Sequence, residues 1–324
     1  MIHNVLSQFG IDGSASIIPM GNAGGFSGAI INQIKSPAGD HCLRKWPTPH
    51  PTQERLDWIH RVLLHGKVNG CPIPFPIRSN AGETFIRFQN HFWELTPWLP
   101  GSANFEQDPN SERLENTVET LAKIHQSNAQ IQLEVGQSRN ILARIEQLRD
   151  FPMRLGMIDR HPSLQHSEMM TSLHSQLRRC SNQVQPCLEN LQQIGYQPLV
   201  LQPVIRDLWH DHILFTGNQV TGIVDFGAMQ MDTVTLDLAR MLGSLIGDPD
   251  DPRWTAALEH YQLFRPLTAT ERRAIQMLDR SAVLLGSLNW LCWIVLEQRS
   301  FEDWTAVKRR VQILGDRLDY FLRE

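Results

Sequence analysis

Two aspartates, Asp207 and Asp225, are the residues of this chain that are best placed to do chemistry. The apolar runs 213–215 and 220–224 lie between them and are separated by Thr216-Gly-Asn, and a Gly/Asn turn between two apolar runs predicts a β-hairpin. Such a hairpin would end at Asp225 and bring it close to Asp207. In phosphoryl transfer, one carboxylate accepts the proton of the attacking hydroxyl and a second one holds the metal ion that bridges the phosphates. The two aspartates therefore predict a phosphoryl-transfer site.

A glycine-rich segment, Gly21-Asn-Ala-Gly-Gly-Phe-Ser-Gly28, lies between two expected strands near residues 17–18 and 29–34. Glycine lets backbone N–H groups approach an anion closely, as in loops that cover phosphates. The same composition also occurs in plain hairpin turns. The aspartates downstream favour the phosphate-binding interpretation. On that interpretation, the loop residues that contact phosphate are Gly24, Gly25, Phe26 and Ser27.

Two adjacent cations, Arg44 and Lys45, lie on a third expected strand, residues 41–46. Strand alternation sends their side chains to opposite faces, so one of them can face a bound nucleotide. The apolar spacing of residues 51–64 then predicts a helix, with Glu54 in its first turn. A carboxylate is favoured there by the helix dipole, so Glu54 is either a surface charge or a partner for the strand cation.

The segment 205–237 resembles the catalytic core of the aminoglycoside phosphotransferase and choline kinase-like family, relatives of the protein kinases. The family pattern is His-x-Asp, an Asn five residues after the Asp, and a hairpin that ends in Asp-Phe-Gly. Asp207 falls on the catalytic-base position and Asp225 on the metal-binding position. Ile205 replaces the usual His, and His212 replaces the Asn. An imidazole suits softer metals than the oxygen ligands that Mg²⁺ prefers.

The resemblance also implies roles for residues outside the hairpin. Arg44 takes the position of a phosphate-pairing lysine, and Glu54 resembles the helix glutamate that orients this cation. Backbone groups of Leu95 and Thr96 would contact the adenine. Arg206 replaces a small residue and would pair with phosphate or with a carboxylate of the C-terminal lobe. The implied cofactors are ATP and Mg²⁺ held by Asp225 and His212, with Mn²⁺ as the alternative metal.

The fold class implied by the resemblance is α+β, a protein kinase-like fold with two lobes. Residues 1–97 form a small β-rich lobe that clamps the nucleotide, and residues 98–324 form a larger, mainly helical lobe with the catalytic loop and the acceptor site. Helical patterns begin at Ser111 and recur over 139–150, 166–194 and 301–322. Asp237 follows Gly227 within ten residues, which leaves no room for the activation segment of a protein kinase and indicates a small-molecule acceptor. We expect Asp237 to be a helix N-cap or first-turn carboxylate.

Composition indicates the class of protein and its surroundings. The chain has 324 residues, of which 41% are hydrophobic and 20% charged, as in ordinary globular proteins. A net charge of −4 argues against a nucleic-acid or anionic-membrane partner. The five cysteines form no Cys-x-x-Cys pair, and neither a signal peptide nor a membrane span is evident, since the apolar stretch 281–296 is too short. We expect a cytoplasmic protein and leave its oligomeric state open.

Two functions remain as hypotheses. The leading one is ATP-dependent transfer of the γ-phosphate to a hydroxyl of a small molecule. The alternative, motivated by Ile205 and His212, is a catalytically silent kinase-like protein that binds a nucleotide or metabolite. The acidic loop 247–252 is either an attraction for a cationic acceptor or a solvated turn, the commoner use of this composition.

Overall fold

The structure, a computed structural model, describes residues 2–21, 28–301 and 303–323. The chain divides into two compact units, which are described separately below. The first unit comprises residues 1–132 and 210–229, and the second comprises residues 133–209 and 230–324. The expected boundary between the lobes, after residue 97, falls inside the first unit. The division into a nucleotide-binding lobe and an acceptor lobe at that residue stays a prediction.

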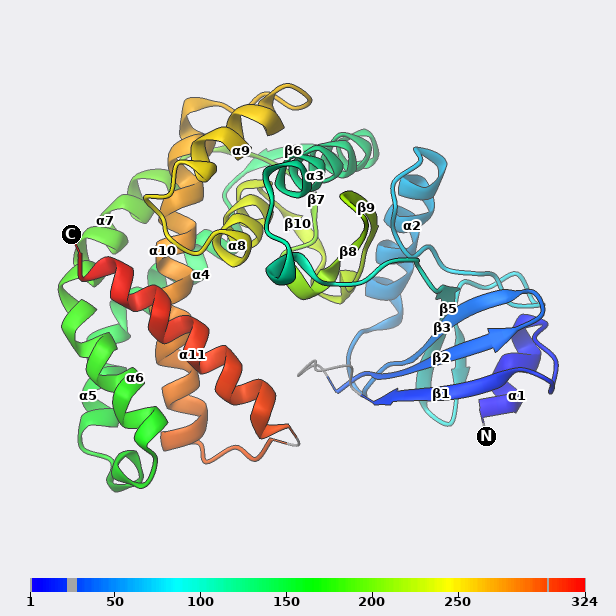
Figure 1. Cartoon of the computed structure of the whole chain (residues 1–324), viewed down its shortest axis with the longest axis horizontal. Helices are drawn as coiled ribbons and strands as arrows, with labels where there is room; N and C mark the ends of the chain where they lie inside the picture. Colours follow the sequence, from blue (N-terminus) through cyan, green and yellow to red (C-terminus); the bar gives the residue numbers. More distant parts are fainter. Residues whose placement is uncertain (1, 22–27, 302, 324) are drawn as a thin grey trace. The chain divides into compact units, whose positions relative to one another are not determined.

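The first unit is built on an antiparallel sheet with the strand order β1-β2-β3-β5-β4 (Figure 1). Its strands are β1 (Ser16–Gly21), β2 (Ile30–Ser36), β3 (Gly39–Lys45), β4 (Ile86–Phe88) and β5 (His91–Pro97). The strands expected near residues 17–18, 29–34 and 41–46 are therefore confirmed. In the register of β3 and β5, Arg44 lies opposite Glu94, and Leu43 lies opposite Leu95.

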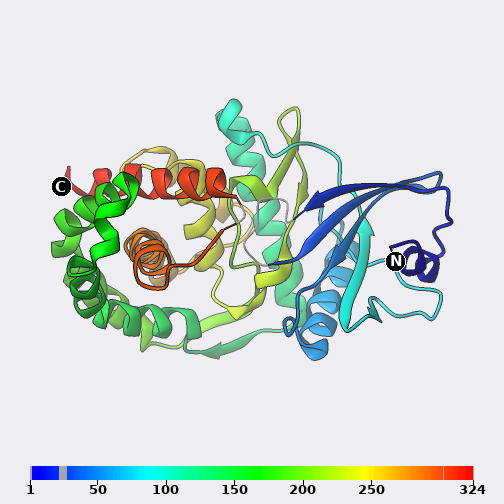
Figure 2. The same cartoon turned by 90° about the horizontal axis from the view of Figure 1, so that it is seen from below.

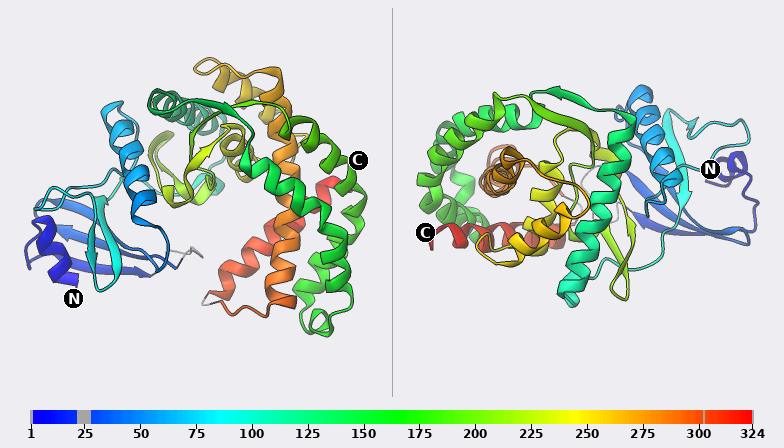
Figure 3. Two further views of the ribbon diagram at one scale, coloured as in Figure 1. Left: turned by 180° about the vertical axis from the view of Figure 1, so that it is seen from behind. Right: turned by 90° about the horizontal axis from the view of Figure 1, so that it is seen from above.

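Side-chain alternation gives the two faces of this sheet different partners. Leu43 and Leu95 are buried in a cluster with Val5 and Leu6 of helix α1 (Ile2–Leu6), which lies against the sheet in Figure 3. Arg44 and Glu94 point to the other face, where helix α2 (Gln53–Val68) supplies His60 as a partner of Glu94. The sheet thus separates an apolar core from a largely buried group of charged side chains.

The first unit also holds the hairpin and one long helix. The expected hairpin is confirmed as β8 (Ile213–Thr216) paired with β9 (Gln219–Ile223). Helix α3 (Ser111–Ile131) begins after Asn110, whose side chain accepts a hydrogen bond from the N–H of Arg113, so Asn110 and not Ser111 is the N-cap.

The second unit is mainly helical. Its helices are α4 (Arg139–Arg149), α5 (Phe151–Asp159), α6 (Glu168–Arg179), α7 (Val184–Gly195), α8 (Thr235–Leu245), α9 (Arg253–Gln262), α10 (Ala269–Leu291) and α11 (Trp304–Phe321). Its strands β6 (Glu134–Gly136), β7 (Leu199–Val204) and β10 (Gln230–Asp232) pair in the order β10-β7-β6. The helical pattern over 166–194 is interrupted, because residues 180–183 form a 3-10 turn between α6 and α7.

Helix α10 is the centre of the second unit. Figure 2 looks along it (orange), with the green helices α4–α7 and the red helix α11 around it. It begins at a capping box between Thr268 and Glu271, a Thr-x-x-Glu spacing that by itself predicts a helix start, and Leu278, Leu284 and Leu288 on it are fully buried. Within the described ranges, no helix is both long and apolar enough to cross a membrane.

Candidate active site

The loop that follows strand β7 carries Asp207 in the second unit. Ile205 before it is fully buried, so the residue in the place of the family's His packs into the core beneath the loop. Arg206 has a φ of 70°, a left-handed conformation that non-glycine residues adopt at a cost of about 1–3 kcal/mol. The Asp207 side chain is 50% exposed and is therefore available to a bound molecule.

Asp237, on helix α8, holds this loop in place. Its carboxylate is fully buried and accepts hydrogen bonds from the backbone N–H groups of Ile205 (2.8 Å) and Arg206 (2.5 Å). The expectation that Asp237 is a first-turn carboxylate is confirmed, because it lies in the first turn of α8, and its contacts with the loop add a role that the sequence does not indicate. A buried carboxylate that receives two backbone N–H groups can compensate for the strain at Arg206.

A cationic side chain contacts Asp207 and links it to an aromatic ring nearby in the chain. Arg240 on α8 donates to Oδ1 of Asp207 from Nη2 at 3.3 Å and from Nε at 3.4 Å. The Arg240 guanidinium also lies 5.8 Å from the ring centroid of Trp209, and the guanidinium of Arg310 on α11 stacks on the same ring. In contrast, Nε of Arg206 is buried without a hydrogen-bond partner among the described residues. The predicted pairing of Arg206 with a phosphate or a carboxylate stays a prediction.

In the first unit, Asp225 follows strand β9 in a strained conformation. Its φ is 64°, and the backbone then turns through Phe226, which is buried. Gly227 lies so close to the Trp46 ring that a Cβ atom would approach it to 3.1 Å. A strained aspartate on a tightly packed turn has a fixed side-chain direction, as a ligand of a metal or phosphate requires.

Arg44 is placed between two carboxylates. Its Nη1 lies 3.2 Å from Oδ1 of Asp225, and its Nε lies 3.6 Å from Oε1 of Glu94. Glu94 is buried, and its other oxygen lies 2.6 Å from Nε2 of His60 on α2. Glu54 is exposed, so Glu94, on the neighbouring strand, takes the position beside Arg44 that the sequence assigns to Glu54. A nucleotide-binding role for Glu54 stays a prediction.

The charges of this group shift its titration. Burial raises the pKa of the Glu94 carboxyl, but the hydrogen bond and charge of His60 and the charge of Arg44 hold the pKa below its ordinary value. Burial likewise raises the pKa of Asp225, and the nearby Arg44 and His212 outweigh it, so that this pKa is also lowered. Both carboxyl groups are therefore ionised at neutral pH, and Arg44 is held between two negative charges.

Helix α2 reaches the turn after Asp225 through Arg55, a residue that sequence reasoning did not single out. Nη2 of Arg55 donates to the backbone oxygens of Gly227 and Met229, both at 3.0 Å. Arg55 follows Glu54 directly, so the predicted link between this helix and the site exists but is made by the next residue. An arginine near the start of a helix gives no sequence signal for such a contact.

The residues predicted to hold a metal, His212 and Asp225, face each other. Nε2 of His212 lies 3.8 Å from Oδ2 of Asp225. Among the described residues, no group of three or more His, Cys, Asp or Glu side chains could hold a metal ion. One imidazole nitrogen and one carboxylate oxygen fit a cation whose other ligands are phosphates and water better than a structural zinc ion with four protein ligands.

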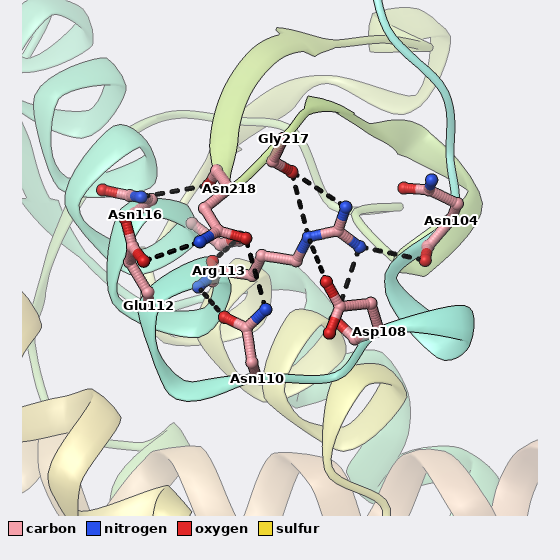
Figure 4. Close-up of polar contacts among 9 residues, drawn as sticks. Asn104, Asp108, Asn110, Glu112, Arg113, Asn116, Gly217 and Asn218 are labelled. Carbon is pink, nitrogen blue, oxygen red and sulfur yellow. Dashed lines mark hydrogen bonds and ion pairs between the residues drawn. The ribbon is translucent and has the colours of Figure 1, made fainter.

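The turn of the β8–β9 hairpin is attached to the start of α3 (Figure 4). The guanidinium of Arg113 donates to the carbonyl oxygen of Gly217 from Nε (3.1 Å) and from Nη2 (2.8 Å). Asn218 donates to Glu112 at 2.6 Å, and Asn116 donates to the carbonyl oxygen of Asn218 at 3.0 Å. Since His212 and Asp225 lie at the open end of this hairpin, the contacts fix the element that carries both.

Two predicted nucleotide contacts remain untested by these interactions. Leu95 and Thr96 are buried in β5, and the carbonyl oxygen of Leu95 accepts a hydrogen bond from Ile77 at 2.7 Å. Their contact with adenine stays a prediction. The loop residues Gly24, Gly25, Phe26 and Ser27 lie outside the described residues.

Comparisons with known proteins agree with this site. A family model described as "Phosphotransferase enzyme family" matches residues 22–276. A homoserine kinase of Polaromonas naphthalenivorans is 24% identical over 71% of this chain and 68% of its own length. The crystal structure of spectinomycin phosphotransferase in complex with ADP and spectinomycin aligns with a TM-score of 0.71 over 99% of this chain and 96% of that chain, at 12% identity.

A second solved structure is the aminoglycoside phosphotransferase of Alicyclobacillus acidocaldarius, with a TM-score of 0.68 at 15% identity, over 99% of this chain and 93% of that one. Both structures have the α+β, protein kinase-like fold that the sequence predicts. The family model extends over most of the chain, including both the Arg44 group and the Asp207 loop. This chain therefore belongs to the phosphotransferase enzyme family and is a small-molecule kinase with a hydroxyl group as the acceptor.

Proposed function

We propose that this kinase transfers the γ-phosphate of ATP to a hydroxyl, with Asp207 as the general base. Arg44, His212 and Asp225 would lie at the nucleotide phosphates. The observation that carries this assignment is the position of Arg44, which lies 3.2 Å from Asp225. On its other side Arg44 is paired with Glu94, which is in turn hydrogen-bonded to His60. A fixed cation beside a fixed carboxylate is what the phosphates of a nucleotide and their counter-ion require.

In the proposed reaction, the acceptor hydroxyl donates its proton to the exposed carboxylate of Asp207. The hydroxyl oxygen forms a bond to the γ-phosphorus, the bond from that phosphorus to the bridging oxygen breaks, and ADP leaves with the electron pair. Arg44 stabilises the negative charge on the phosphates, because its guanidinium is already oriented. We propose that the loop at Gly24–Ser27 covers the phosphates and that backbone groups of Leu95 and Thr96 contact the adenine.

Asp225 and His212 would hold a divalent cation, Mg²⁺ or Mn²⁺, which neutralises phosphate charge when it is bound. An imidazole ligand favours Mn²⁺ over Mg²⁺ relative to a site with oxygen ligands alone. We also propose that the protein works in the cytoplasm, where ATP is available. Its five cysteines, all within the described ranges, are free thiols, in agreement with a reducing compartment.

Thermal unfolding with ATP or GTP tests the nucleotide site, each with Mg²⁺, with Mn²⁺ or without metal, in the wild type and in Asp225→Asn. A nucleotide at about 100 times its dissociation constant stabilises the native state by roughly 2.7 kcal/mol. We expect a metal-dependent rise of the unfolding midpoint that Asp225→Asn abolishes. The absence of a shift with every nucleotide would overturn the proposal. Nucleotide binding without transfer to any acceptor would instead favour a catalytically silent binding protein.

A further inference from the structure

Three arginines come from the segments next to Asp207, and acceptance of a proton by that carboxylate does not by itself explain them. Arg206 comes from the loop, Arg240 from α8 and Arg310 from α11, and all three belong to the second unit together with Asp207. Arg240 contacts Asp207 directly, and both Arg240 and Arg310 contact the Trp209 ring. The half-exposed carboxylate of Asp207 is thus in contact with Arg240, which shares the Trp209 ring with Arg310, and it follows Arg206 directly in the chain.

Two of these arginines are close enough to a fourth one, Arg144, to lower its pKa. The pKa of Arg144 on α4 is lowered to about 10, first by burial and in smaller part by the positive charges of Arg206 and Arg240, against the opposite effect of Cys187 and Asp279. Arg144 itself is satisfied by the carbonyl oxygen of Leu278 and by the hydroxyl of Ser281. It therefore adds positive charge without offering its own donors to a ligand.

The nearby carboxylates balance this charge only in part. Asp237 is occupied by the N–H groups of Ile205 and Arg206, and Asp279 forms a 2.5 Å ion pair with Arg317. Asp207 is paired with Arg240 and keeps an exposed surface.

The acidic loop 247–252 offers little to a cationic acceptor. Asp251 is paired with Arg253 at 2.7 Å, and Asp248 lies 3.4 Å from Arg323. Two of its three carboxylates, those of Asp248 and Asp251, are thus paired within the second unit, which agrees with the interpretation of this loop as a turn and weakens the sequence argument for a cationic acceptor.

Arg206 supplies the most specific indication of a ligand. Its Nε is buried and has no hydrogen-bond partner among the described residues, although a buried donor of a charged group is costly to leave unmatched. It also stands at a φ of 70°, where a glycine would be free of strain. A strained arginine with an unused donor beside the reacting carboxylate is explained if a bound anion completes its hydrogen bonds.

We propose that Arg206, Arg240 and Arg310 form an anion-binding subsite for the acceptor, so that the phosphorylated hydroxyl belongs to a small molecule that also carries a carboxylate or a phosphate. This inference rests on the proposed function, because it names the class of acceptor for the same site. Guanidinium groups bind such planar or tetrahedral anions through paired N–H groups, and the subsite would orient the hydroxyl toward Asp207. Hydroxy acids are acceptors of this class, and their amides, which lack the carboxylate, are not.

The test compares hydroxy acids with their amides as acceptors, for example L-homoserine with L-homoserinamide and 4-hydroxybutyrate with 4-hydroxybutyramide. The enzymes are the wild type, Arg206→Gly and the control Arg273→Gln, which removes one exposed positive charge from α10. Arg206→Gly suits the backbone, so a loss of activity cannot be assigned to misfolding when its unfolding midpoint is unchanged or raised. ADP formation gives kcat and KM for each acceptor and for ATP.

We expect the wild type to prefer the acid over its amide by at least tenfold in kcat/KM. Arg206→Gly should raise KM for the acid about tenfold or more, bring the ratio of acid to amide toward one, and leave KM for ATP within about twofold. Arg273→Gln should behave as the wild type.

Several results would overturn the inference while the proposed kinase function stands. Amides could be phosphorylated as well as acids, or Arg206→Gly could raise KM for ATP and leave the acids unaffected, which would assign the arginines to the nucleotide phosphates. If no acceptor of either series is phosphorylated, calorimetric titration of 4-hydroxybutyrate decides the matter. Binding that Arg206→Gly abolishes would support an anion site without the proposed reaction, and no binding would overturn it.

Discussion

The backbone N–H of Arg206 donates a 2.5 Å hydrogen bond to Oδ1 of Asp237, and this contact joins the loop of Asp207 to the first turn of α8. The residue before the proposed base is thereby kept in a left-handed conformation that its side chain disfavours. The position of the Asp207 carboxylate consequently depends on Asp237. In the proposed mechanism Asp237 does not itself contact the reactants.

Asp237→Asn should therefore impair catalysis more than nucleotide binding. The amide keeps the shape but turns one acceptor toward an N–H group as a donor, so we expect a loss of roughly 2–3 kcal/mol in the free energy of unfolding. The proposed base would then be displaced, which lowers kcat by at least tenfold with KM for ATP nearly unchanged. Steady-state kinetics and denaturant unfolding measure both effects. A normal kcat in a destabilised variant would show that the contact is structural alone.

Glu94 should matter more to the nucleotide site than Glu54. Glu94→Ala leaves His60 and Arg44 without their shared buried carboxylate, and removal of one partner of a buried pair costs about 3–5 kcal/mol. We expect a lower unfolding midpoint and a KM for ATP raised at least tenfold. Glu54→Ala, at an exposed position, should change both by little. Equal effects of the two substitutions on KM for ATP would restore Glu54 as the partner of Arg44.

The contacts that attach the β8–β9 turn to the start of α3 lead to a prediction about Arg113. Arg113→Ala removes both hydrogen bonds to the Gly217 carbonyl oxygen and the packing of the guanidinium on Phe215, where the distance to the ring centroid is 4.9 Å. We expect a loss of about 3 kcal/mol in the free energy of unfolding. Faster hydrogen exchange at the amides of β8 and β9 would show that the hairpin has loosened. Glu115→Ala, at an exposed position on α3, is the matched control.

Much of the fold could be predicted from the sequence, because strong local patterns specify it. The glycine–asparagine turn gave the hairpin, strand alternation put Arg44 and Lys45 on opposite faces, and Thr268 with Glu271 gave the start of α10. Such signals lie within a few residues of each other, so a single sequence contains them.

The contacts between distant elements could not be predicted in the same way. Glu94 is the partner of Arg44 because β3 and β5 are neighbours in the sheet. The spacing of residues within each strand does not predict the order of the strands. Asp237 bonds to the loop of Asp207 because α8 packs beneath it, whereas its sequence context is that of any first-turn carboxylate. Arg55 reaches the turn after Asp225 for a similar reason.

Acid should destabilise the protein through Glu94. Its pKa is lowered in the folded state from an ordinary value of 4.5, so its ionised form stabilises the fold at neutral pH, and this contribution is lost as the pH falls below about 4.5 through the folded-state pKa. Glu94→Gln should therefore have a free energy of unfolding that depends less on pH in this range. Denaturant unfolding between pH 3 and pH 7 measures it, with Glu115→Gln as the control. An unchanged pH dependence in Glu94→Gln would contradict the assigned ionisation.

The central claim, that Asp207 promotes transfer of the γ-phosphate to an acceptor hydroxyl, is tested most directly by ³¹P NMR of the reaction mixture. The wild type, given ATP, Mg²⁺ or Mn²⁺ and a panel of hydroxyl acceptors that includes the hydroxy acids, should form ADP and a phosphate monoester. Asp207→Asn should bind ATP as the wild type does but form the monoester at least a hundredfold more slowly, since general-base catalysis contributes about 10²–10⁴-fold. Equal rates in the two proteins would contradict the role of Asp207.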